Sequence, residues 1–67
     1  MKQEMIIHQD RNMRITRLLA KRGNECKYKI EVTTGRATQS YEKYCASDGE
    51  AFKICWLKLK ELQRKEP

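Results

Sequence analysis

Residues 25–34 read ECKYKIEVTT, and this stretch decides the fold class. Apolar residues at positions 26, 28, 30 and 32 alternate with charged residues at positions 25, 27, 29 and 31. A period of two places the apolar side chains on one face of a β-strand and the charged side chains on the other. The stretch therefore predicts a strand in a sheet with one buried face and one charged face.

The segments on both sides are expected to be neighbouring strands. Residues 13–21, MRITRLLAK, fit both a helical stripe and an interrupted strand alternation. Residues 22–24, RGN, are a turn signal, which favours a strand that closes a hairpin. Thr34-Gly35 predicts a second tight turn, and residues 36–45, RATQSYEKYC, predict a third strand. Short connections of this kind suit antiparallel neighbours.

Residues 47–50, SDGE, begin a helix. Ser47 followed three residues later by Glu50 has the spacing of a capping box, and acids suit the positive end of the helix dipole. At about 100° per residue, the apolar residues beyond them fall within an arc of about 140°. The pattern predicts an amphipathic helix over about residues 48–64. Its expected core stripe consists of Ala51, Phe52, Cys55, Trp56, Leu59 and Leu62.

The predicted fold class is α+β, with an antiparallel meander packed against one C-terminal amphipathic helix. Residues 1–12 mix charges with the short apolar run Met5–Ile7, and predict an N-terminal arm or an edge strand. The meander has three strands, or four if this segment joins it. Residues 13–67 are expected to form a single β-β-β-α domain. A chain of this size buries only about 60% of its unfolded surface, so a homodimer is one expected way to add stability.

The sequence predicts no enzyme. His8 is the only histidine, and no nucleophile or carboxylate is placed beside it by the sequence pattern. The scattered glycines form no phosphate-binding loop, and Cys26, Cys45 and Cys55 lack zinc-ligand spacing. We therefore expect no metal, no cofactor and no small-molecule substrate. The three thiols suit a reduced cytoplasmic protein, with one disulfide as the alternative, and no apolar run approaches membrane-spanning length.

The net charge of +6 is concentrated in residues 13–24, which contain no acid. Such a segment favours an anionic partner, either DNA or a host protein with an acidic surface, although charge also keeps a small protein soluble. A basic sheet face can enter the DNA major groove, while Glu25 and Glu31 on that face would repel phosphate. The acids Glu25, Glu31 and Glu42 are expected to pair across strands with Lys27, Lys29 and Lys43. The candidate DNA-binding residues are Arg14, Arg17, Arg22, Lys27, Lys29 and Arg36.

A second candidate surface lies on the back of the predicted helix. Ile54 and Leu57 fall outside the core arc, where large aliphatic side chains suggest contact with another protein. Tyr44 is added to this protein-binding set because tyrosine combines a large contact area with a polar tip. Single exposed apolar residues are also common without any partner.

The strand 27–32, the turn at Gly35, a third strand and the helix start Ser47–Ala51 resemble a known arrangement. It is that of the small amino-terminal arm-binding domains of tyrosine-family phage and transposon integrases. The resemblance implies DNA binding through the outer sheet face, here Lys27, Lys29 and Arg36 together with the arginines of the first strand, although the chain lacks a catalytic integrase domain. The chain also resembles phage or mobile-element accessory proteins. That likeness implies the alternative function, an inhibitor or adaptor that modulates a host enzyme or an anti-phage defence complex.

Overall fold

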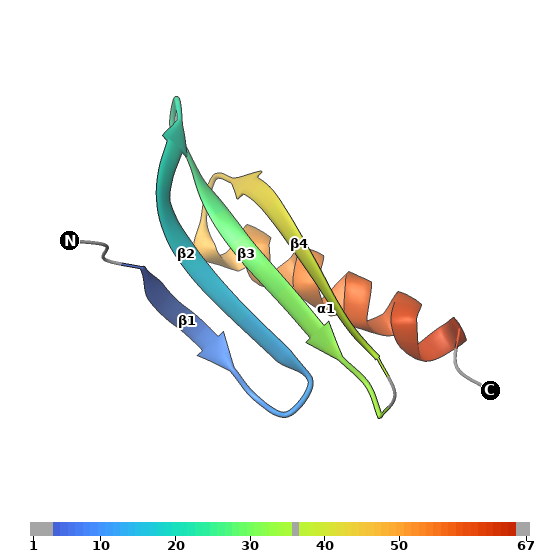
Figure 1. Cartoon of the computed structure of the whole chain (residues 1–67). Coiled ribbons are helices and arrows are strands. Elements are labelled where there is room, and N and C mark those ends of the chain that lie inside the picture. The colour runs from blue at the N-terminus through green and yellow to red at the C-terminus, as the bar shows by residue number, and fades with distance from the viewer. Residues whose placement is uncertain (1–3, 36, 66–67) are drawn as a thin grey trace.

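Four strands and one helix follow one another along the chain in the computed structural model, which describes residues 4–35 and 37–65 (Figure 1). The elements are β1 (Met5–Gln9), β2 (Met13–Arg22), β3 (Glu25–Thr33), β4 (Thr38–Cys45) and α1 (Asp48–Lys65). The strands form one antiparallel sheet in the order β1-β2-β3-β4. The α+β prediction is therefore confirmed in its four-stranded form. The ambiguous segment 13–21 is a strand.

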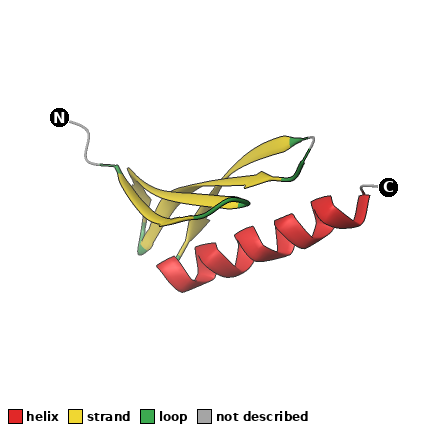
Figure 2. Cartoon of the chain, turned by 90° about the horizontal axis from the view of Figure 1, so that it is seen from below, coloured by secondary structure: helices red, strands yellow, loops and turns green. Residues whose placement is uncertain are grey.

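The helix α1 covers one face of the sheet and leaves the other face open (Figure 2). It lies mainly against β3 and β2. The alternation predicted in β3 is confirmed, because Tyr28, Ile30 and Val32 are buried beneath α1. The buried core of the described residues consists of Met13, Ile15, Tyr28, Ile30, Val32, Cys45, Ala51, Cys55, Leu59 and Leu62.

The orientation of α1 differs from the prediction in one respect. Phe52 and Trp56, expected in the core, are 39% and 45% exposed. The helix instead places its small residues against the sheet, and Ala51 and Cys55 are fully buried. Small side chains let the helix backbone approach closely, so the bulky aromatic rings lie on its flank. Ile54 shows the opposite departure, because it is half-buried and packs against the core.

The helix start agrees with the predicted cap. The backbone N–H of Glu50 donates to the Ser47 hydroxyl at 3.2 Å, as an N-cap residue requires. The backbone N–H of Ala51 donates to the Ser47 carbonyl, also at 3.2 Å. The second bond is the first regular bond of the helix, and the first satisfies the Glu50 N–H, a donor that an uncapped helix end would leave without a partner.

The hairpin turns follow from local side-chain chemistry. Gly23 has a φ of 63° in the β2–β3 turn, a conformation that a residue with a Cβ rarely adopts. In the β1–β2 turn, one carboxylate oxygen of Asp10 accepts hydrogen bonds from the backbone N–H groups of Asn12 and Met13, both at 2.8 Å. A hydrogen bond from His8, followed by the one from Asn12, lowers the pKa of Asp10.

All three cysteines are free thiols. Cys26 and Cys45 are register partners across β3 and β4, and Cys55 is buried in α1. Burial raises the pKa of the Cys45 thiol and raises that of Cys55 to about 11. Because the thiolate is the nucleophile, these two groups behave as small core side chains.

Candidate interaction surfaces

The sheet face turned away from α1, called the outer face below, carries most of the predicted DNA-binding residues. The strand register pairs Arg14 with Glu31, and Lys27 with Tyr44. Because side chains alternate along a strand, these residues lie opposite the buried set of β3. The cations that the structure brings together on the outer face are Arg14, Arg22, Lys27 and Lys29.

Three of these four cations already have a carboxylate partner. Arg14 Nε lies 3.2 Å from Glu31 Oε1, and Arg22 Nη2 lies 3.6 Å from Glu25 Oε1. Lys27 Nζ lies 3.0 Å from Glu42 Oε1, and this hydrogen bond is the main reason that the pKa of Lys27 is raised. The outer face is therefore a network of ion pairs with a small surplus of positive charge.

Only part of this pairing follows the sequence prediction. The three acids were expected to pair with Lys27, Lys29 and Lys43, and the Lys27–Glu42 pair confirms this for one of them. The other two acids pair with arginines of β2 instead. Within the described part of the chain, no ion pair involves Lys29.

Tyr44 lies among the outer-face cations rather than beside the helix. The guanidinium carbon of Arg22 is 4.5 Å from the centre of the Tyr44 ring, and Lys27 Nζ is 5.8 Å from it. These are cation–π distances. Its position groups Tyr44 with the candidate DNA-binding residues, whereas the sequence had grouped it with Ile54 and Leu57.

Arg17 does not join the outer face, and its predicted location there is wrong. It occupies the strand position that faces α1, where Nη1 lies 3.3 Å from Asp48 Oδ1. The Tyr28 hydroxyl donates to the same oxygen at 2.5 Å. Burial, and then this hydrogen bond, raise the pKa of Tyr28 to about 12. Arg17 thus helps to fasten the start of α1 to the sheet. Arg36, the remaining predicted residue, lies outside the described residues.

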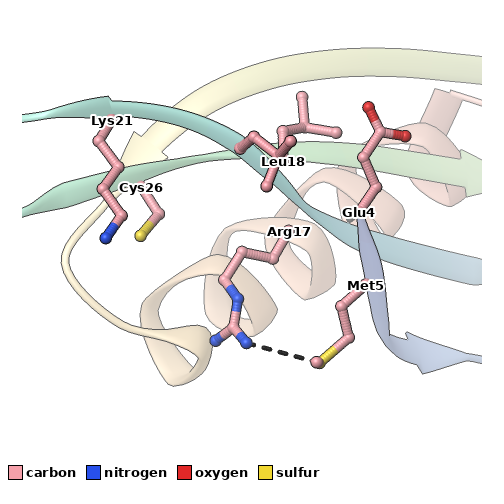
Figure 3. Close-up of a pocket in the computed structure, with 7 residues that line it drawn as sticks. Glu4, Met5, Arg17, Leu18, Lys21 and Cys26 are labelled. Atoms are coloured by element: carbon pink, nitrogen blue, oxygen red, sulfur yellow. Dashed lines mark hydrogen bonds between the residues drawn. The ribbon is translucent and has the colours of Figure 1, made fainter. Parts of the chain in front are cut away.

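An open hollow of about 590 Å³ lies where β2 extends past the start of β1 (Figure 3). It exists because Met5, the first residue of β1, pairs with Arg17, so that the rest of β2 pairs with β3 alone. At the edge of this hollow, Arg17 Nη2 donates a hydrogen bond to Met5 Sδ at 3.5 Å. The lining residues are Glu4, Met5, Arg17, Leu18, Leu19, Lys21 and Cys26. The lining thus combines apolar side chains with charges of both signs, and it includes the Cys26 thiol.

A second hollow of about 350 Å³ lies between α1 and the edge strand β4. Leu57 is 51% exposed there, as predicted, beside the half-buried Ile54. Lys58 reaches over the Tyr41 ring, with Nζ 4.9 Å from its centre. The lining residues are Lys43, Ile54, Leu57, Lys58 and Glu61, so this apolar site has charges of both signs around it.

On the back of α1, its solvent face, the sequence predicted a surface only for Ile54 and Leu57, and the cations beside Leu57 were not predicted as a candidate site. Lys53, Lys60 and Arg64 are exposed on this face, and Lys60 Nζ lies 4.8 Å from the centre of the Trp56 ring. The signal was present in the sequence, since residues seven and eleven positions apart return to nearly the same side of a helix. It was missed because Trp56 was placed in the core.

A scan against protein-family models found no match, and searches of the curated proteins and of the solved structures found none either. Among residues 4–35 and 37–65, no three His, Cys, Asp or Glu side chains gather in a way that could hold a metal ion. Among the described residues, no helix is both long enough and apolar enough to cross a membrane. The arguments for function therefore come from the surfaces themselves.

Proposed function

We propose that this chain is a small non-catalytic accessory protein that binds DNA through the outer face of its sheet. The observation that supports the proposal is the cluster of Arg22, Lys27, Lys29 and Tyr44 on a sheet face that α1 leaves open. Cations there can contact phosphates, and a pair of strands fits the width of the major groove. The net charge of +6 favours the same class of partner.

The ion pairs of the outer face are compatible with this function. An exposed ion pair contributes only about 0–1 kcal/mol to stability, so a phosphate can replace the carboxylate beside a cation. The carboxylates still reduce the positive potential of this face. We therefore expect a modest affinity with strong salt dependence.

The double variant Lys27→Glu with Lys29→Glu tests the proposal. Duplex affinity should fall, and the slope of log K against log salt concentration should weaken by about 1.8, at about 0.9 for each lost phosphate contact. Fluorescence anisotropy of a labelled duplex at several salt concentrations measures both. The matched control is Lys43→Glu with Lys65→Glu, which changes the net charge equally away from the outer face. Equal losses in both variants, or no loss in the first, would contradict the proposal.

The second candidate function is binding to a host protein, as an inhibitor or adaptor, through the hollow beside β4. The supporting observation is that the exposed Leu57 and the half-buried Ile54 adjoin the open edge of the sheet. An edge strand has backbone groups available to pair with another strand. A second copy of the chain could use the same edge, which is the homodimer alternative.

Leu57→Asp tests this second candidate. The partners recovered from a host lysate should be lost, because a charge at the centre of an apolar contact is costly to desolvate. Leu19→Asp is the matched control, since Leu19 is similarly exposed at 54% but lies in the other hollow. Sedimentation as a monomer at all concentrations would remove the homodimer alternative.

A further inference from the structure

The solvent face of α1 carries a basic stripe, defined here as Lys53, Lys60 and Arg64 together with Trp56. At about 100° per residue, the three cations project within about 40° of one another, on the side of the helix opposite the buried residues. The helix rise places Lys60 about 10.5 Å from Lys53 and about 6 Å from Arg64 along the axis. All four side chains are exposed.

The stripe differs from the outer face because no carboxylate of the described residues forms an ion pair with any of its three cations. Of the acids of the described helix, Asp48 pairs with Arg17 and Glu61 lines the hollow beside β4. Glu50 lies in the first turn, three residues before Lys53, and forms no ion pair with it. A ligand that approaches the stripe therefore meets positive charge that is available for pairing.

The arrangement of apolar residues argues against a membrane surface as the ligand. Helices that lie on membranes bury a continuous apolar face and direct their cations away from it. Here the cations occupy the middle of the exposed face, with Trp56 on one side and Leu57 on the other. Insertion of both apolar residues would bury the cations between them.

Trp56 is the aromatic member of the basic stripe. The residue is 45% exposed and is not part of the buried core. Lys60 lies over the ring in an exposed cation–π contact, which is weak enough for Lys60 to turn to a phosphate while a base takes its place. Only an unpaired base offers a free face to such a ring, because the bases of a duplex are stacked on one another.

The geometry points to the basic stripe as a binding site for single-stranded nucleic acid. The three cations contact successive phosphates, and the Trp56 ring stacks on one base. The inference adds a second surface to the proposed DNA-binding function, and rests on it only for the class of partner. Figure 2 shows that α1 covers one face of the sheet, so the outer face and the side of α1 turned away from the sheet point in opposite directions. One chain could therefore hold a duplex and a single strand together.

The intrinsic fluorescence of Trp56 gives a direct test, since it is the only tryptophan of the chain. Titration with an oligothymidylate of about 16 nucleotides should quench it to saturation. The slope of log K against log salt concentration should be about −2, from three contacts at about −0.7 each. Trp56→Leu should lower the affinity, measured by anisotropy of a labelled oligonucleotide, by about 5- to 150-fold, and Trp56→Phe should retain most of it.

Matched charge reversals separate the stripe from general electrostatics. The first variant replaces Lys53, Lys60 and Arg64 by Glu, and the control replaces Lys43, Lys58 and Lys65, so that both lose the same charge. The first should lose affinity for the oligonucleotide at least tenfold more than the control, on the order of one to two lost phosphate contacts. Circular dichroism checks that both variants keep the helix.

Three outcomes would overturn the inference. They are no saturable quenching, equal losses in the two triple variants, or quenching by phosphatidylserine vesicles without quenching by the oligonucleotide. The proposed function has its own test, because it predicts that duplex affinity depends on Lys27 and Lys29. Its failure therefore leaves the result for the oligonucleotide unchanged. Loss of duplex binding in that variant with intact oligonucleotide binding would support two independent surfaces.

Discussion

The outer face of the sheet and the basic stripe of α1 both display cations, but they differ in what lies beside each cation. On the sheet, Arg14, Arg22 and Lys27 each have a carboxylate within 3.6 Å or less. On the helix, Lys53 and Lys60 have no such partner among the described residues. Net charge alone does not distinguish the two surfaces. The difference teaches that an anionic ligand must displace a carboxylate at three of the four outer-face cations, whereas the cations of the stripe form no ion pair among the described residues.

The largest expected effect concerns whether the solvent face of α1 is dispensable for folding. Leu59 is 8% exposed and Leu57 is 51% exposed, although they are two residues apart. Leu59→Ala should reduce the free energy of unfolding by about 2–5 kcal/mol. Leu57→Ala should change it by no more than about 0.5 kcal/mol. Urea denaturation measures both, and similar costs for the two variants would mean that the exposed face also stabilises the fold.

The next effect concerns the contact between the sheet and the start of α1, where Tyr28 hydrogen-bonds to Asp48. Tyr28→Phe removes the hydrogen bond to Asp48 and should cost about 1.5–3 kcal/mol, the range for hydrogen bonds to charged groups. It should also change the alkaline limit of stability. The pKa of Tyr28 in the folded chain is raised to about 12, so the unfolded chain loses this proton first as the pH rises.

Folding therefore favours the protonated tyrosine, and stability should fall between about pH 10, the ordinary tyrosine pKa, and about pH 12. Thermal unfolding across this range, with Tyr28→Phe as the comparison, measures the effect. A variant whose stability falls as steeply as that of the original chain would contradict the raised pKa.

The smallest effect tests the paired cations directly. Replacing Glu25, Glu31 and Glu42 by Gln should release the outer-face cations and strengthen duplex binding. One additional phosphate contact corresponds to about an eightfold gain at about 0.1 M salt. Glu50→Gln with Glu61→Gln is the control on the helix, and should leave duplex affinity nearly unchanged. An unaltered affinity after the sheet substitutions would show that their carboxylates do not limit binding.

Much of the fold was predictable because its signals are local. The alternation around Tyr28 and Ile30 places β3 with one face buried, and Ser47 marks the start of α1. The strand character of residues 13–21 depended on tertiary pairing, because that segment fits two periods. Arg17 interrupts the apolar alternation of this segment. It lies at a position that faces α1, where it forms an ion pair with Asp48.

The candidate surfaces were less predictable because they depend on register and on helix rotation. Strand pairing decides that Glu31 lies beside Arg14 rather than beside a lysine. The size of the residues at the contact decides how α1 rotates, and the small Ala51 and Cys55 turn Trp56 toward solvent. The sequence pattern placed all the apolar residues of the arc in the core, and it could not tell that Ala51 and Cys55 are buried while Trp56 is exposed.

The meander order of the sheet also bears on how the chain reaches its fold. Each strand pairs with the strand that precedes or follows it in the sequence, and only a few residues close each hairpin. Contacts between residues close in sequence need little loop-closure entropy, which favours fast folding. The docking of α1 on β2 and β3 is the main contact that skips a neighbouring strand. The hairpins can therefore form early, and the transition to the native state should depend on when α1 docks against the sheet.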